Sequence, residues 1–380
     1  MINSKIKIMY LIDELLIGGT ETQLVLLTRK LPKELFEPII GVLHRTDRIE
    51  LHADVPIVYF GCTGIPGLRN VSLLLKLKKY LEKEKIDILQ SQFSESTIYG
   101  SWAVRLKRNR PILISTRRDL YHWINDEPWA FRAMRHTVGW TDRILVNSHS
   151  ALKECQRVEH VPIEKLMMIQ NAVEIGDFDG ISSIEAKKTI GLENKFPVIG
   201  VLANFRPVKG LCSFVEAAAR VYREIPNAHF VFVGRGPQEQ ELRALSNSLG
   251  IEKKVHFLVD YHDIKTAIMA FDIGVQSSLS ESLSNVLLEY MAAARPIVAT
   301  RVGDAERVIQ DGDNGLLVHP NDPEAISQAI LRLVRDYGAA LEMGKRARKK
   351  VEENWLPSMI VDNYVKFYLE LIELRALRNG

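Results

Sequence analysis

The chain has 380 residues, of which 46% are hydrophobic, and it carries 50 Lys and Arg against 47 Asp and Glu. This length and mix are typical of a globular protein with two domains. The net charge of +3 is too small for a general nucleic-acid binder. Three cysteines are too few for a disulfide framework, so we expect a reducing, cytoplasmic compartment. No uncharged apolar run approaches the ~18 residues of a membrane span, and the N-terminus does not resemble a signal peptide.

Short apolar runs alternate with amphipathic stretches from the N-terminus onward, which predicts a parallel sheet covered by helices on both faces. The strands expected in this first series are 6–12, 38–43, 55–60, 86–90, 112–115, 143–146 and 166–169, and the helices are 21–31, 71–84 and 94–107. The pattern then restarts, with strands expected at 196–202, 228–233, 255–258, 273–276, 296–300 and 315–319 and helices at 210–224 and 238–249. We therefore predict an α/β protein of two tandem Rossmann-like domains.

A polar, turn-rich stretch at 176–190 is typical of a hinge between domains. We place the first domain at 1–178 and the second at 190–355. Two helical segments, 337–354 and 358–377, follow at the C-terminus and are separated by Pro357. The apolar stripe of the last segment fits a cap on the second core or a helix that crosses back to the first domain, and we expect the latter.

The most informative segment is 277–300, where a predicted strand runs into a serine-rich turn and then a helix. The N-terminus of such a helix offers free N–H groups and the positive end of a dipole to an anion. Glu281 lies in the turn and Glu289 about two helical turns further on. Two such carboxylates can hold the hydroxyls of a sugar, although a capping Glu and an exposed helical Glu would explain the same spacing.

This segment, with the Pro-Ile-Val-Ala-Thr strand that follows it, resembles the signature of family-4 retaining glycosyltransferases of GT-B fold. The resemblance implies two Rossmann-like domains facing a central cleft. It implies that Glu281 binds hydroxyls of the donor sugar and that Glu289 binds the ribose of the nucleotide. The backbone N–H groups implied to hold the diphosphate belong to Ser282, Leu283, Ser284 and Asn285. Ser282 and Arg295 stand where the family usually has Gly.

Glycines elsewhere match the same family. Gly18 and Gly19 follow the first predicted strand, and the resemblance places this loop against the donor phosphates and the transferred sugar. Gly234 and Gly236 lie in a Val-Gly-Arg-Gly-Pro sequence that would let the chain pass under the nucleobase. From spacing alone, both are plain strand-to-helix turns.

A cationic loop follows the first strand of the second domain. Lys209 matches a family lysine that neutralises the diphosphate, whereas Asn204 stands where the family usually has Arg. Arg206, two residues on, is a shifted substitute. A departing diphosphate without a metal needs at least one fixed cation, although a solvent-exposed basic loop would look the same in sequence.

On the acceptor side, Arg118 and Asp119 follow the predicted strand 112–115. Many family members have His where Arg118 stands, and Arg cannot act as a general base because it stays protonated. We expect Arg118 to bind an anionic acceptor and Asp119 to accept a hydroxyl proton, with a surface ion pair as the alternative. Gln90 and Gln92 stand in the place of a His-x-His often seen in the family.

We predict no metal and no cofactor. Asp311 and Asp313 form an Asp-x-Asp sequence, but they precede an Asn-Gly turn that matches this family rather than a metal site. The donor substrate implied by the resemblance is a nucleoside-diphosphate sugar, with a UDP-sugar favoured and a GDP-sugar as the alternative.

The predicted activity is transfer of a hexose, with retention, to a hydroxyl of a glycan or lipid-linked acceptor in exopolysaccharide, lipopolysaccharide or glycolipid synthesis. A nucleotide-sugar 2-epimerase and a non-catalytic nucleotide-sugar-binding member are the alternatives. We expect a monomer or weak dimer.

Six basic residues fall within the fourteen positions 105–118. They suggest a local basic face that meets an anionic acceptor at the inner surface of a membrane. These residues are Arg105, Lys107, Arg108, Arg110, Arg117 and Arg118.

Overall fold

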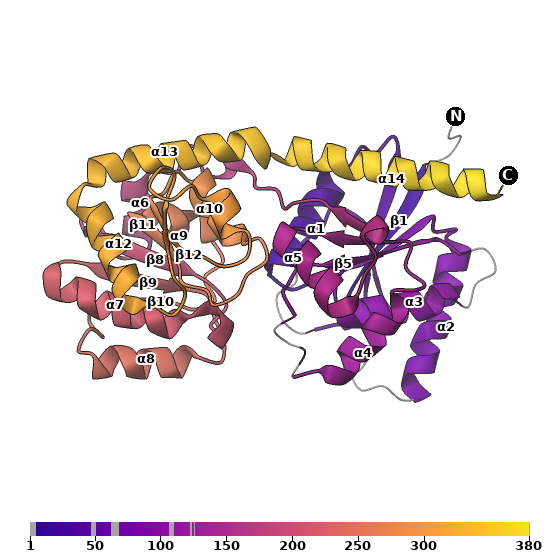
Figure 1. Cartoon of the computed structure of the whole chain (residues 1–380), viewed down its shortest axis with the longest axis horizontal. Coiled ribbons are helices and arrows are strands. Elements are labelled where there is room, and N and C mark those ends of the chain that lie inside the picture. Colours follow the sequence, from indigo (N-terminus) through magenta and orange to yellow (C-terminus); the bar gives the residue numbers. More distant parts are fainter. Residues whose placement is uncertain are drawn as a thin grey trace. The chain divides into compact units, whose positions relative to one another are not determined.

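The computed structural model of the chain describes residues 5–46, 51–61, 68–105, 110–121, 124 and 126–379. The chain divides into two compact units, one formed by Met1–Asn171 with Pro357–Gly380 and the other by Ala172–Leu356. Each unit is a parallel β-sheet with helices on both faces (Figure 1). The prediction of two Rossmann-like domains is confirmed.

The sheet of the first unit has the strand order β3-β2-β1-β4-β5-β6-β7 in its described part, and these neighbouring strands pair in parallel. Its strands are β1 (Ile6–Ile12), β2 (Phe36–Val42), β3 (Ile57–Tyr59), β4 (Ile88–Ser91), β5 (Ile112–Arg117), β6 (Arg143–Val146) and β7 (Leu166–Met168). Its α-helices are α1 (Gly19–Lys30), α2 (Leu68–Lys83), α3 (Ser94–Arg105), α4 (Pro128–Thr137), α5 (His149–Glu154) and α14 (Pro357–Asn379).

The second unit repeats the arrangement with the order β10-β9-β8-β11-β12-β13. Its strands are β8 (Val198–Leu202), β9 (His229–Val233), β10 (Val255–Leu258), β11 (Ile273–Gln276), β12 (Ile297–Thr300) and β13 (Leu316–Val318). Its α-helices are α6 (Ser183–Thr189), α7 (Leu211–Glu224), α8 (Glu239–Ser248), α9 (Ile264–Ala270), α10 (Asn285–Ala292), α11 (Ala305–Val308), α12 (Pro323–Arg335) and α13 (Tyr337–Asn354).

Each sheet has one point at which the order of strand addition reverses. It lies between β1 and β4 in the first unit and between β8 and β11 in the second. In open parallel sheets, ligands bind beyond the carboxyl ends of the strands at such a switch point. The thirteen predicted strands all exist, and the central strands of both sheets are buried as the pattern requires, whereas β3 and β7 are half-buried.

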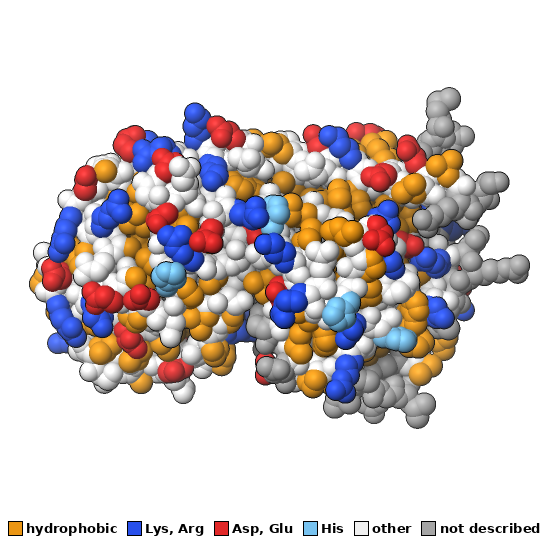
Figure 2. Space-filling model, in the orientation of Figure 1, with side chains coloured by type: hydrophobic (Ala, Val, Ile, Leu, Met, Phe, Trp, Pro, Cys, Tyr) orange, Lys and Arg blue, Asp and Glu red, His pale blue; other side chains and the backbone are white. Residues whose placement is uncertain are grey.

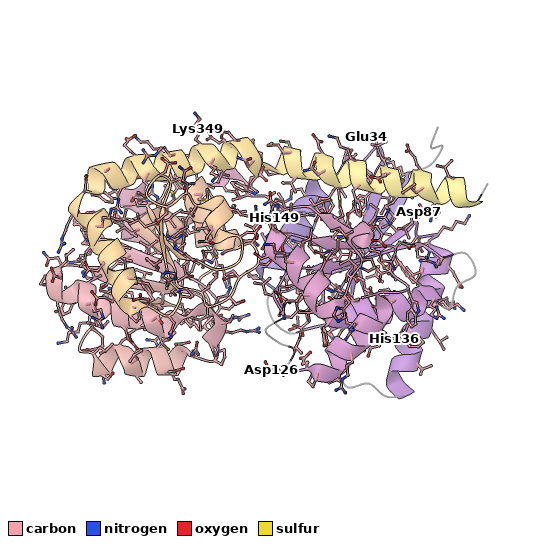
Figure 3. The ribbon with its side chains drawn as sticks, viewed as in Figure 1. Glu34, Asp87, Asp126, His136, His149 and Lys349 are labelled. Carbon is pink, nitrogen blue, oxygen red and sulfur yellow. The ribbon has the colours of Figure 1, made fainter. Side chains whose placement is uncertain are left out.

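The C-terminal helix belongs to the first unit, as predicted. α14 packs against α1 and β5 and lies along that unit (Figure 1). Near its end, Arg375 Nη2 donates to Asp87 Oδ1 over 2.9 Å, and Asp87 is labelled beside α14 in Figure 3. Tyr368 is fully buried and donates to Gln90 Oε1 over 2.7 Å. The helix therefore completes the core of a unit that begins more than 350 residues earlier in the sequence.

The predicted hinge at 176–190 is wrong. This stretch lies inside the second unit, and its apolar residues Ile175, Phe178 and Ala186 are buried in that unit's core. α6 begins within it, at Ser183. The polar side chains between these apolar positions face outward, so composition alone could not separate a packed segment from a linker. The first unit ends at Asn171 instead of residue 178.

Charge is mixed on the surface. Figure 2 shows Lys and Arg side chains interspersed with Asp and Glu on the face in view. No helix among the described residues is both long enough and apolar enough to cross a membrane.

Candidate active site

An ion pair spans the switch point of the second unit. Lys209, after β8, and Glu281, after β11, lie with Nζ 2.6 Å from Oε1. Ser278 Oγ donates to the same carboxylate oxygen over 2.7 Å. Both charged side chains are mostly buried, with 26% of Lys209 and 14% of Glu281 exposed, so their attraction is screened less than that of a surface pair. The two residues that sequence placed at the leaving diphosphate and the donor sugar are thus in direct contact.

Tight backbone contacts hold the two loops together. Gly210 has a φ of +61°, and a Cβ on it would lie 2.2 Å from the carbonyl oxygen of Ser277, so only glycine fits. The N–H of Leu279 donates to the carbonyl of Val208 over 2.8 Å. Ser277 Oγ donates to the carbonyl of Lys209 over 3.0 Å. The loop after β8 therefore has a fixed position relative to the loop after β11.

A helix N-terminus completes this edge of the sheet. Ser284 is the N-cap of α10, and its Oγ accepts from the N–H of Leu287. Ser282 and Leu283 are buried in the preceding turn, and Asn285 opens the helix. The N–H groups of this turn and the dipole of α10 form an environment that favours an anion. Ser282 fits in place of the usual glycine, since it is buried there without a left-handed φ.

Glu289 lies on the second turn of α10 and is half-buried. Its carboxylate has no hydrogen-bond or ion-pair partner among the residues that the structure describes. Burial raises its pKa to about 7, an effect that Lys265 reduces and Asp177 increases. A carboxylate that is desolvated and unpaired in the free protein is able to accept hydroxyl groups from a ligand.

The remaining donor-side residues differ in how strongly they are fixed. Gly234 and Gly236 have positive φ, and a Cβ on either would overlap the backbone of Ala203 or Phe205. They hold the loop after β9 against the loop after β8. Asn204 is exposed. Arg206 is also exposed, and its side chain makes no hydrogen bond or ion pair in the described part of the chain, so it is able to turn toward a ligand.

In the first unit, Gly18 and Gly19 form the start of α1, as the sequence predicted. Gly18 is the N-cap and Gly19 the first helical residue. A Cβ on Gly18 would lie 2.5 Å from Glu21 Oε2, so the Glu21 carboxylate folds back over this start. Burial raises the pKa of Glu21 to about 7, while Arg118 acts in the opposite direction. The sequence analysis assigned no role to Glu21.

Arg118 follows β5 and is half-buried. Its Nη1 donates to Asn171 Oδ1 over 2.9 Å, and its Nη2 donates to Tyr364 Oη of α14 over 3.3 Å. It forms no ion pair among the described residues, so the alternative of a surface ion pair is wrong for Arg118. Asp119 Oδ1 accepts from the N–H of Tyr121 over 2.9 Å, an Asx-type turn that positions its carboxylate.

The neighbouring arginine is in a different environment. Arg117 is buried, and its Nε and Nη2 donate to Glu159 over 2.6 and 3.0 Å. Arg110 likewise forms a two-pronged pair with Asp142. Arg105 stacks on Trp140, with its Cζ 4.5 Å from the ring centroid. The predicted basic face is therefore wrong for Arg117 and Arg110, because both charges are neutralised by carboxylates far away in sequence. Lys107 and Arg108 lie outside the described residues.

The Asp311–Asp313 turn is occupied by ion pairs. Asp311 Oδ2 accepts from Arg301 over 2.7 Å, and Asp313 Oδ1 lies 2.8 Å from Arg346 Nε. No group of three or more potential ligand side chains gathers in the described part of the structure.

Two buried polar partners escaped the sequence analysis. Tyr364 was expected only in an apolar stripe, yet its hydroxyl contacts Arg118. Gln90 was compared with a family histidine, yet it is fully buried and accepts from Tyr368. Polar residues in an otherwise apolar strand or helix stripe were the available signal, but their partners lie 246 and 278 positions away.

Family models match both units. A model described as "Glycosyltransferase Family 4" matches residues 17–176, and one described as "Glycosyl transferases group 1" matches residues 196–336. The two matches together extend over most of both sheets.

Two relatives match over most of their length. The chain is 26% identical over 313 residues to N-acetyl-alpha-D-glucosaminyl L-malate synthase of Bacillus anthracis, with 82% of this chain and 81% of that protein covered. It is 24% identical to the UDP-Gal:alpha-D-GlcNAc-diphosphoundecaprenol alpha-1,3-galactosyltransferase of Escherichia coli, with 97% of this chain and 98% of that protein covered.

A solved structure shares the fold. The Anabaena HepE protein, crystallised in complex with UDP and glucose, superposes with a TM-score of 0.84 at 18% identity, over 96% of this chain and all of that one. The family models and the relatives agree on glycosyl transfer. The chain belongs to the family-4 glycosyltransferases of GT-B fold.

Proposed function

We propose that the protein transfers a hexose from a nucleoside-diphosphate sugar, most favourably a UDP-sugar, to a hydroxyl of a glycan or lipid-linked acceptor with retention of anomeric configuration. The observation that carries this proposal is the Lys209–Glu281 pair at the switch point of the second sheet, beside the N-terminus of α10. Two similar proteins support the donor class, since the name of the Escherichia coli relative includes UDP-Gal and Anabaena HepE was crystallised with UDP.

The donor is assigned to the second unit. Glu281 accepts hydroxyls of the sugar and Glu289 hydroxyls of the ribose. The N–H groups of Ser282, Leu283, Ser284 and Asn285 bind the diphosphate. Gly234 and Gly236 lie beneath the nucleobase, with Asn204 at the rim of the site. For Gly18 and Gly19, the role that the resemblance implies at the donor phosphates and sugar stays a prediction.

Charge stabilisation carries the chemistry in this proposal. As the bond between the sugar and the diphosphate breaks, negative charge builds on the departing oxygen. Lys209, the turn N–H groups before α10 and the mobile Arg206 side chain offset that charge. The protein itself supplies these positive groups, so the proposal requires no metal and no cofactor. The departing diphosphate accepts the proton of the incoming hydroxyl, which attacks from the same face.

The acceptor is assigned to the first unit. Arg118 and Asp119 both follow β5 at the carboxyl edge of that sheet, where polar groups meet a ligand. Arg118 orients the acceptor and cannot remove its proton. Asp119 accepts a hydrogen bond from the acceptor hydroxyl.

Replacing Glu281 tests the assignment. We expect Glu281→Ala to lower the rate of transfer by about 10²- to 10³-fold, the usual effect of removing one group that binds the reacting centre. Circular dichroism should show an intact fold, although the unfolding temperature should fall by a few degrees because Lys209 loses its ion-pair partner. Glu252→Ala, on an exposed turn, is the matched control. Unchanged turnover in Glu281→Ala would contradict the proposal.

A second experiment identifies the donor and the acceptor. UDP- and GDP-sugars are screened for binding, and the products are then analysed by mass spectrometry.

We also propose that the protein acts in the cytoplasm as a monomer or weak dimer, in peripheral contact with an anionic membrane surface. The acceptor named for the Escherichia coli relative contains a diphosphoundecaprenol group, which supports this setting. Since Arg110 and Arg117 are paired internally, the contact depends on the other basic residues. Flotation with anionic liposomes at low salt tests it, and an absence of binding would contradict it.

A further inference from the structure

Arg118 is held rigidly by neutral groups. Asn171 and Tyr364, which accept its two hydrogen bonds, are each only 4% exposed, so they fix the plane of the guanidinium. The Nε atom is buried and has no partner within the described residues. Each Nη atom carries a second hydrogen for which the described residues supply no acceptor.

The unpaired N–H groups of Arg118 point to a particular class of ligand. A guanidinium has five N–H groups in one plane, and the Nη hydrogens that Asn171 and Tyr364 leave without an acceptor match the two oxygens of a carboxylate or a phosphate. Hydroxyl oxygens of a neutral sugar would satisfy single N–H groups but would leave the positive charge uncompensated. The arrangement therefore favours an anion.

The adjacent Arg117 shows what a purely structural arginine looks like in this fold. Each nitrogen of its guanidinium donates to an acceptor, Nε and Nη2 to Glu159 and Nη1 to the carbonyl of Thr116. Arg118 is one residue further along the chain but receives no carboxylate. Its charge is left for something that the protein binds.

We propose that Arg118 is a specificity-determining residue that pairs with an anionic group, a carboxylate or a phosphate, carried either by the acceptor or by the transferred sugar. This inference rests on the proposed function, because it assumes that the chain binds a nucleotide sugar and an acceptor. It goes further by restricting the substrates to a charged class.

Glu21 acts electrostatically on Arg118 but forms no ion pair with it among the described residues. The Glu21 carboxylate folds over Gly18 instead, so the unpaired Nη hydrogens of Arg118 stay available to another anion.

The test begins with protein saturated with UDP, so that the diphosphate site is filled. Sulfate is the probe, because it stays doubly charged near neutral pH, and glycerol is the neutral control. The quantity measured is the dissociation constant of sulfate, obtained by titration at constant ionic strength. We expect sulfate binding that Arg118→Gln weakens by about 10- to 100-fold, the effect of losing a charged two-pronged hydrogen bond. Arg118→Lys should recover only part of it, and the exposed Arg132→Gln should change it less than about twofold.

A second arm identifies which substrate carries the anion. If the transferred sugar carries it, UDP-glucuronate should bind at least about tenfold tighter than UDP-glucose, and Arg118→Gln should abolish that preference. If the acceptor carries it, the two donors should bind alike while sulfate still binds to the UDP-saturated protein.

The inference is overturned if Arg118→Gln alters neither sulfate affinity nor donor preference. UDP binding separates this failure from that of the proposed function. A wild-type protein that binds UDP but shows no Arg118-dependent anion binding leaves the proposed function intact, whereas a protein that binds no nucleotide contradicts the proposed function itself.

Discussion

The carboxyl edges of the two sheets carry their charges in opposite ways. At the edge of the second sheet, Lys209 and Glu281 neutralise each other over 2.6 Å. At the edge of the first, Arg118 is held only by the neutral groups of Asn171 and Tyr364. In the first arrangement each charge compensates the other until a ligand competes for them. The second gives Arg118 no ion-pair partner among the described residues, although Glu21 acts on it electrostatically.

This difference teaches how a charged side chain is assigned to function. The two residues of an internal ion pair at a switch point contribute both to the stability of the protein and to its chemistry. A single substitution there therefore affects folding and activity together. A cation with neutral partners contributes little to folding, so its replacement should affect binding alone. The predictions below test that separation, and they run from the largest expected effect to the smallest.

Lys209→Ala should lower the transfer rate by about 10³-fold, because it removes the fixed cation nearest the departing diphosphate. The rate constant at saturating donor is the quantity to measure. Lys253→Ala, on an exposed turn of the same unit, is the control and should retain full activity. A fall of less than about tenfold for Lys209→Ala would transfer the leaving-group role to Arg206 or to the turn N–H groups.

Arg117→Ala should destabilise the protein by about 3–5 kcal/mol, because it leaves the fully buried carboxylate of Glu159 without its cation. Urea unfolding followed by circular dichroism measures the change. Removing both charges with Arg117→Met and Glu159→Leu should restore most of the loss. Arg118→Gln is the matched neighbour and should cost less than about 1 kcal/mol; equal losses at the two positions would contradict the contrast between them.

Glu289→Gln should stabilise the free protein by about 2 kcal/mol at about pH 8 and hardly at all at about pH 4.5. Burial raises the pKa of Glu289 in the folded protein to about 7, from an ordinary value of 4.5. Between these values the folded state holds more protons than the unfolded one, so stability falls as pH rises through this window. Unfolding in urea at the two pH values checks the sign, with Glu252→Gln as the exposed control. A gain that is equal at both pH values would show that the Glu289 carboxylate is not responsible. The same variant should bind UDP more weakly, since it loses the ribose contact.

Much of this protein could be read from its sequence. Alternation of apolar runs and amphipathic stretches predicted all thirteen strands, since a strand buried on both faces must be apolar throughout. The helices α4 and α12 were not predicted, although both are strongly amphipathic and begin with a proline signal. The glycine positions and the turn before α10 were predictable because backbone geometry limits which residue fits there.

Sequence by itself determined the strands, the sharp turns at their ends and the set of charged residues placed near those ends. Only the tertiary structure decided which charges are free. Arg117 and Arg118 are equivalent in sequence, but one meets Glu159 and the other meets Tyr364 from a helix 246 residues away. The hinge was misplaced for a related reason, since burial of Ile175 and Phe178 depends on packing and not on local composition. Local propensity sets backbone shape over a few residues, whereas the compensation of a charge depends on distant chain segments that only folding brings together.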